Sequence, residues 1–158
     1  MADDCPPVSV SLRIAAPADA IFALLADPSR HPDIDGSGMV QGPVASGAVT
    51  GVGDVFVMRM RSRKKGEYEI NNHVVEFVPG RRIAWEPAAG RGLPEEGTPR
   101  MGHRWTYELA ADGPDATVVT ETYDCSRAPE SERIGMANGE MWREAMADTL
   151  ARLARHVE

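Results

Sequence analysis

The sequence lacks an excess of basic residues. Its 17 Lys and Arg are outnumbered by 24 Asp and Glu, which gives a formal net charge of −7 at pH 7. Nucleic acids and anionic lipid surfaces both attract proteins through a basic face. The charge balance therefore argues against a nucleic-acid partner and against adhesion to an anionic membrane.

Long apolar runs and cysteines are also scarce. No apolar run approaches the roughly 20 residues that span a bilayer, and the first five residues, MADDC, are acidic and polar. We therefore expect no stable membrane insertion, no signal peptide and a cytoplasmic location. Cys5 and Cys125 lie far apart in the chain, with Cys5 in a terminus expected to be loose. A structural disulfide is not expected, and a reducing compartment fits this cysteine usage.

Motifs for metals, phosphates and activated nucleophiles are missing too. The four histidines do not show metal-ligand spacing, and no Gly-x-Ser-x-Gly segment or phosphate-binding glycine loop occurs. We therefore expect no metal site and no cofactor.

The patterns that are present indicate one α+β domain over residues 1–158. The chain has no repeat or linker, and its length is that of a single domain. Apolar residues alternate from Val8 to Ile14, which predicts a strand, and a proline opens a short amphipathic helix over 17–26. A second short turn, 29–35, follows. Further strands are predicted at 39–45, 54–61, 67–78, 81–86, 101–111 and 116–124. Short turns between consecutive strands favour an antiparallel sheet.

The longest predicted helix covers residues 138–156 at the C-terminal end. Trp142, Met146, Leu150 and Leu153 recur at three or four residues, which places them on one face. A helix with one apolar face has to bury that face, so we expect it to pack against the sheet.

Four segments carry a resemblance to a known family. They are IAAPADAIFALLADPSRHP (14–32), VEFVPGRRIAW (75–85), WTYEL (105–109) and VVTETYD (118–124). With the long C-terminal helix, they resemble the START-like (SRPBCC) superfamily, and within it the polyketide cyclase/dehydrase-like proteins. The resemblance covers nearly the whole chain. It implies a helix-grip fold: a curved seven-stranded antiparallel sheet wrapped around the C-terminal helix, with two short helices between strands one and two. It also implies a hydrophobic cavity for a lipid, polyketide, steroid or similar molecule.

Residues on the inward faces of the predicted strands are candidates for a ligand site. Successive side chains of a strand point to opposite faces, so counting back from Phe77 by twos places His73 and Asn71 inward. On the strand predicted at 101–111, the same alternation places Tyr107 inward with Leu109 and Trp105. His73, Asn71 and Tyr107 are the candidate catalytic residues, because they could orient carbonyl groups and move protons. A structural histidine bonded inside the core is the alternative for His73. The predicted ligand-binding set is aromatic, methionine-rich and weakly polar: Met58, Met60, Asn71, His73, Trp85, Trp105, Tyr107, Trp142 and Met146.

Three further features could affect a ligand. Glu121 points inward if Val119 and Tyr123 do, and outward if the alternate residues do; we favour an outward, surface position. The basic segment 61–65 is expected at a hairpin tip near the cavity opening, where it could steer an anionic ligand. Segment 87–100 is long for a hairpin connection and could form a lid.

These observations leave three functions open. Binding or transport of a small hydrophobic or aromatic metabolite ranks first, because no complete catalytic set is visible. A polyketide cyclase or dehydratase using His73, Asn71 and Tyr107 is the second. An interaction domain with a vestigial cavity is the third. The fold alone does not decide among them, and the sequence does not indicate an oligomeric state.

Overall fold

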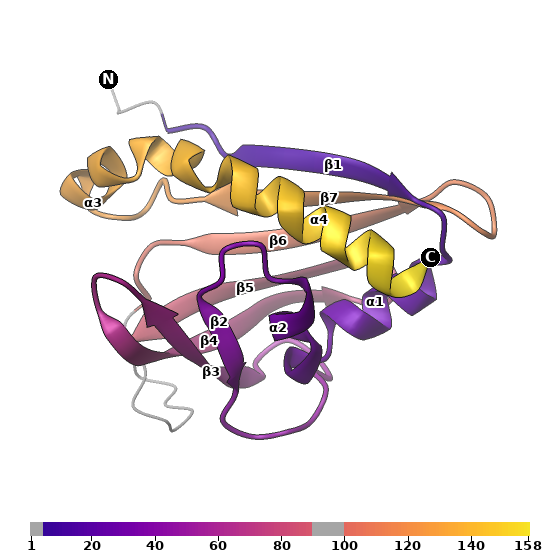
Figure 1. The fold of residues 1–158 in the computed structure, drawn as a ribbon, viewed down its shortest axis with the longest axis horizontal. Coiled ribbons are helices and arrows are strands. Elements are labelled where there is room, and N and C mark those ends of the chain that lie inside the picture. Colours follow the sequence, from indigo (N-terminus) through magenta and orange to yellow (C-terminus); the bar gives the residue numbers. More distant parts are fainter. Residues whose placement is uncertain (1–4, 90–99) are drawn as a thin grey trace.

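The computed structural model describes residues 5–89 and 100–158 (Figure 1). The strands are β1 (Val8–Ile14), β2 (Val40–Pro43), β3 (Val55–Ser62), β4 (Gly66–Val78), β5 (Arg82–Ala89), β6 (Arg104–Ala111) and β7 (Thr117–Asp124). The helices are α1 (Ala18–Leu25), α2 (His31–Ile34), α3 (Glu130–Gly135) and α4 (Arg143–Val157), with 3₁₀ turns at Pro28–Arg30 and Ala137–Trp142.

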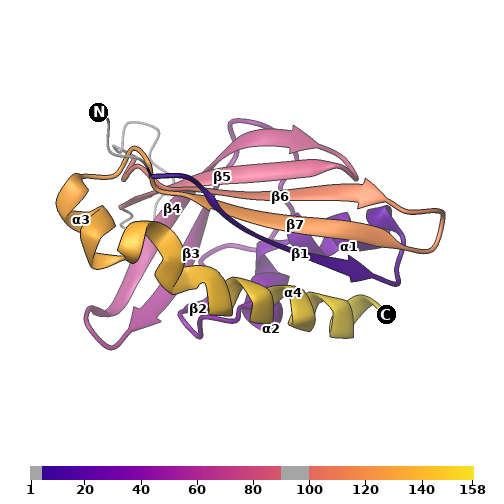
Figure 2. The ribbon, with the colours of Figure 1, turned by 90° about the horizontal axis from the view of Figure 1, so that it is seen from above.

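One sheet contains all seven strands, in the order β1-β7-β6-β5-β4-β3-β2, and each neighbouring pair is antiparallel. α4 crosses one face of this curved sheet, and α1 and α2 lie on the same side (Figure 2). We call this helix-covered face the inner face and the opposite one the outer face. This is the helix-grip arrangement that the sequence predicts.

Helix α2 is held against α4 by a close approach at Gly36. A Cβ added at Gly36 would lie 2.3 Å from the carbonyl oxygen of Ala145 on α4, so only glycine fits this contact. The Gly36 N–H donates to the Thr149 hydroxyl at 2.9 Å. This contact fixes α2 and the loop that follows it over the inner face of the sheet.

A bulge in β4 changes which of its side chains face inward. Val74 pairs with Trp85 and Glu76 pairs with Ala84, so Val75 is an extra residue on the β4 side. An extra residue reverses the alternation of side chains on either side of it. Positions before the bulge therefore have the opposite orientation from that obtained by counting back from Phe77.

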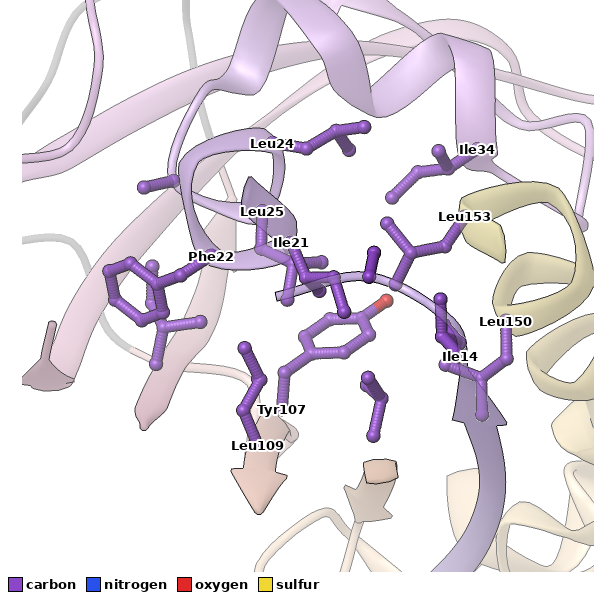
Figure 3. Close-up of a cluster of buried hydrophobic side chains, with 14 of the residues drawn as sticks. Ile14, Ile21, Phe22, Leu24, Leu25, Ile34, Tyr107, Leu109, Leu150 and Leu153 are labelled. Carbon is purple, nitrogen blue, oxygen red and sulfur yellow. The ribbon is translucent and has the colours of Figure 1, made fainter. Parts of the chain in front are cut away.

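The core consists of two clusters. The larger lies between α1, α2, α4 and the sheet, and in Figure 3 the Tyr107 ring lies among its aliphatic side chains. The smaller contains Cys5, Val8, Tyr123 and Cys125.

Both cysteines are buried free thiols with their sulfur atoms 3.7 Å apart. The expectation of a loose terminus at Cys5 is therefore wrong, because Cys5 packs into this second cluster.

The C-terminal helix begins later than predicted. Ala137 and Asn138 have φ of 50° and 54°, and Gly139 has φ of 95°, so a left-handed break precedes α4 at Arg143. The predicted apolar face is nevertheless present, because Met146, Leu150 and Leu153 are buried. Within the described residues, no helix combines the length and apolar character that crossing a membrane requires.

Candidate functional site

A cavity of about 820 Å³ lies between the inner face of the sheet and the helical side of the molecule. Seven of the eight methionines and seven of the nine aromatic residues line it. The methionines are Met39, Met58, Met60, Met101, Met136, Met141 and Met146. The aromatic residues are Phe56, Tyr68, Trp85, Trp105, Tyr107, Tyr123 and Trp142. Methionine and aromatic side chains together form an adaptable, polarisable wall that suits an apolar ligand.

At the α2 end of the cavity, the aromatic rings pack around His31. The His31 ring stacks on Trp85 with centroids 5.3 Å apart, and Phe56 meets both rings edge-on. His31 Nε2 donates to the carbonyl oxygen of Leu25 at 2.8 Å. Burial lowers the pKa of His31, so its ring is neutral at pH 7. This end therefore presents aromatic surfaces, and His31 adds no positive charge to it at pH 7.

A second aromatic group lies toward α3. Trp105 contacts Tyr123 with centroids 4.3 Å apart, and Trp142 approaches Trp105 edge-on at 6.4 Å. The Tyr123 hydroxyl lies 2.6 Å from Nδ1 of His103. Burial lowers the pKa of His103 as well. The three tryptophans of the chain therefore all lie in the cavity wall, where a bound molecule would alter their fluorescence.

The cavity opens to solvent beside the β3–β4 hairpin. Arg63, Lys64 and Lys65 belong to its lining and are exposed. Met141 on the opposite side is also exposed, at 54 %. The structure thus places the predicted basic hairpin at the opening; whether it steers anions stays a prediction.

A buried carboxyl group, Glu121 on β7, belongs to the inner wall of the cavity. Glu121 is 3 % exposed, and the Tyr107 hydroxyl donates to its Oε2 at 3.0 Å. Its Oε1 has no hydrogen-bond partner among the described residues. Burial raises the pKa of Glu121 to about 8, against the lowering effect of the Tyr107 hydrogen bond, and the nearby charge of Asp35 raises it further. The carboxyl is therefore mostly protonated at pH 7.

The favoured outward position of Glu121 is wrong. On β7, the buried residues are Thr117, Val119, Glu121 and Tyr123, so the polar Glu121 belongs to the inward series. The sequence contained the signal, because Val119 and Tyr123 flank Glu121 at two-residue spacing. Of the two alternatives, the structure has the inward one, and the Tyr107 hydrogen bond and the raised pKa accommodate the carboxyl there.

The family model described as polyketide cyclase/dehydrase and lipid transport matches residues 7–158. The chain belongs to this family. Among its curated relatives, the uncharacterized protein Rv0088 of Mycobacterium tuberculosis is 36 % identical to this chain over 117 residues. That match covers 74 % of this chain and 46 % of the relative, so the chain spans about half the length of the curated relatives it matches.

Solved structures show the same fold. Protein CV1439 of Chromobacterium violaceum superposes with a TM-score of 0.68 at 18 % identity, covering 97 % of this chain and 98 % of that one. DynU16, from the dynemicin biosynthetic locus, gives a TM-score of 0.62 at 20 % identity, covering 98 % of this chain and 47 % of that one. At these identities the likeness concerns the fold of this polyketide cyclase/dehydrase family member and not its activity.

In this chain, most of the predicted ligand-binding residues lie together around the cavity. Those in the wall are Met58, Met60, Trp85, Trp105, Tyr107, Trp142 and Met146. Their role in ligand binding stays a prediction.

Asn71 and His73 do not belong to the cavity wall, although both are buried. The register pairs Phe56 with Asn72 and Met58 with Ile70, and these four residues line the cavity. Asn71 and His73 alternate with them and belong to the outer face. The predicted inward placement is therefore wrong, and the cause is the bulge at Val75, which alternation counted from Phe77 does not reveal.

Other residues of the wall were missed, and one predicted feature cannot be placed. His31 and Asn72 line the cavity, but no periodic pattern in the sequence marks them. Of the predicted lid 87–100, Pro87 lines the cavity, and residues 90–99 lie outside the described residues. Within the described part of the chain, no group of three or more His, Cys, Asp or Glu side chains could hold a metal ion.

Proposed function

We propose that this protein binds a small, predominantly apolar aromatic molecule in the cavity and acts as a binding or carrier protein. The observation that carries the proposal is the composition of the wall, which contains seven of the eight methionines and seven of the nine aromatic residues. Small-molecule sites are typically concave and apolar, with a few polar groups that orient the ligand. The cavity volume of about 820 Å³ is within the range of such sites.

Cyclase or dehydratase chemistry on a polyketide-like substrate is the second candidate. The observation that favours it is the Tyr107–Glu121 pair, because a protonated buried carboxyl is a possible general acid. His73 and Asn71 do not support this candidate, since neither lines the cavity. An interaction domain with a vestigial cavity receives no comparable support, because such a domain does not need an open cavity of this size.

The test is titration of the protein with N-phenyl-1-naphthylamine, a neutral apolar fluorophore that accepts energy from tryptophan. Because Trp85, Trp105 and Trp142 all line the cavity, binding should quench tryptophan emission and sensitise the probe with a single saturating site. Native mass spectrometry should show one bound probe per chain.

A pair of substitutions on α4 makes the test specific to the cavity. Ala145 lines the cavity, whereas Ala147, two residues further along the helix, is exposed. We expect A145F to occupy ligand space and weaken probe binding by about tenfold, a loss of about 1.4 kcal/mol, and A147F to bind like the parent. Quenching that stays linear with probe concentration, or that is equal in the two variants, would contradict the proposed function.

A further inference from the structure

Most polar side chains in the cavity wall are already bonded within the protein. His31 donates to a backbone carbonyl, and the Thr149 hydroxyl donates to a carbonyl of its own helix. The two carboxylate oxygens of Asp35 accept the backbone N–H groups of Ser37 and of Val40 at the start of β2. Two buried polar atoms of the wall have no hydrogen-bond partner among the described residues: Nε1 of Trp142, which can only donate, and Oε1 of Glu121, whose Oε2 accepts from Tyr107. A buried polar atom without a partner costs about 1–3 kcal/mol, so a ligand that supplies one binds more tightly.

The surroundings of Glu121 determine which partner it can accept. Among the described residues, no Lys or Arg is one of the groups that act on it, and the nearby charge is that of Asp35, which is negative. A second negative charge at this depth would be opposed by both burial and Asp35. The carboxyl is therefore held as a neutral acid, which has one O–H donor. Since Oε2 receives the Tyr107 hydrogen bond, the proton is available at Oε1.

We propose that Glu121, positioned by Tyr107, is a polar subsite that recognises an uncharged hydrogen-bond acceptor, such as a ketone or quinone oxygen, on the aromatic ligand. This inference rests on the proposed function, because it assumes that an aromatic molecule occupies the cavity. It narrows the ligand class to aromatic molecules whose buried end has a neutral oxygen acceptor. Molecules that would have to place a carboxylate or phosphate beside Glu121 and Asp35 are disfavoured.

The subsite should respond to pH through Glu121. The titratable groups that share its part of the wall are His31 and Asp35 on the α2 side, Tyr107 on β6 and Tyr123 on β7. β1 places Val10 opposite Glu121, and α4 contributes the uncharged Met146 and Thr149. Burial lowers the pKa of His31 and raises those of both tyrosines, so none of these three changes charge between pH 7 and 9. Glu121, with a pKa of about 8, ionises in this interval and then can only accept a hydrogen bond.

The experiment compares 9-fluorenone with fluorene, which have the same fused-ring shape and differ in the carbonyl oxygen. Neither compound ionises between about pH 7 and 9.5, and each is titrated in competition with N-phenyl-1-naphthylamine to measure its affinity for the cavity. At about pH 7 we expect fluorenone to bind roughly five-fold more tightly than fluorene, the effect of one neutral hydrogen bond. At about pH 9.5 this preference should disappear, because the ionised carboxylate has no proton to donate.

Two substitutions assign the preference to Glu121. E121Q keeps an N–H donor and cannot ionise, so it should prefer fluorenone equally at both pH values. E121L has neither donor nor acceptor, so it should bind the two compounds alike. If E121L does not fold, the pH-independent preference of E121Q is sufficient to test the proposal, with fluorene binding as the measure of an intact cavity.

The outcomes separate this inference from the proposed function. Equal affinity of the parent for fluorene and fluorenone at about pH 7 would overturn the subsite and leave the carrier function standing. A fluorenone preference that persists unchanged in E121L would also overturn it, because the carbonyl would then be recognised elsewhere. Failure of both compounds to displace the probe would contradict the proposed function itself.

Discussion

The two faces of the sheet use the same residue type, glutamate, in opposite ways. On the outer face, Glu76 pairs with Arg82 and Arg104, and Glu86 accepts from Arg104 at 2.8 Å. On the inner face, Glu121 is paired with the neutral Tyr107, and no arginine or lysine of residues 5–89 and 100–158 is among the groups that act on it. A carboxyl beside arginines is favoured as an anion, whereas a buried carboxyl without a cation is favoured as an acid. Position relative to the helices, and not residue identity, therefore decides the chemistry.

The largest expected difference between the faces is in the pH dependence of stability. The pKa of Glu121 is about 8 in the folded protein and near its ordinary value of 4.5 when exposed. Between these values the folded state keeps a proton that the unfolded state has released. The free energy of unfolding should therefore fall as pH rises, by up to about 1.4 kcal/mol per pH unit.

Urea unfolding of the parent, E121Q and E86Q at several pH values from about 5 to 8 measures this effect. E121Q should gain stability relative to the parent as pH rises, because it has no proton to lose. E86Q is the outer-face control, and its curve should keep the slope of the parent. Parallel curves for the parent and E121Q would mean that the buried carboxyl is not held neutral.

A smaller difference is expected from the loss of one hydroxyl on each face. Y107F removes the donor to Glu121 and leaves Oε2 buried without a partner, at a cost of about 1–3 kcal/mol. S11A removes an exposed hydroxyl that lies 2.7 Å from that of Thr120 across the β1–β7 pair, and should cost less than about 1 kcal/mol. Urea unfolding at about pH 6 compares them. Equal losses would show that the inner face is as well solvated as the outer face.

The smallest effect is expected from breaking an outer-face ion pair. Arg104 is 37 % exposed at its side chain, so R104M should cost no more than about 1 kcal/mol, and less at high salt. R13M, which breaks the more exposed pair with Asp112, is the matched control and should change stability by a smaller amount still. Thermal unfolding at low and high ionic strength measures both. A loss of several kcal/mol that salt does not reduce would place Arg104 in a buried network and remove the contrast between the faces.

Much of the fold could be predicted because local patterns repeat along the chain. The alternation from Val8 to Ile14, the proline before α1 and the apolar face of α4 each reflect a period or a cap that the residues themselves display. The start of α4 could not be predicted, because Ala137 and Asn138 adopt positive φ that their residue types do not require.

The lining of the candidate site was predicted for its apolar residues and for Tyr107, and was missed for Glu121, His31 and Asn72. Methionines and tryptophans on strands such as β3 follow regular alternation, so Met58 and Trp85 were placed correctly in the cavity wall. The alternation of side chains is interrupted at the β4 bulge, so His73 lies on the outer face and not on the inner face where counting placed it. Glu121 was misplaced because either alternate set of β7 residues could point inward, and the sequence alone did not select between the two sets.

The sequence by itself determined a seven-stranded antiparallel sheet with a long C-terminal helix and a wall of methionine and aromatic side chains. These features follow from hydrophobic periodicity, which acts between near neighbours in the chain. The tertiary structure alone decided that Glu121, Tyr107 and Asp35 share one buried region, and that Asn72 takes the inward position expected for His73. The β4 bulge is defined by the pairing of β4 with β5, and the pKa of Glu121 depends on its burial and on Tyr107 and Asp35. These neighbours are distant in sequence, so they come together only when the chain is folded.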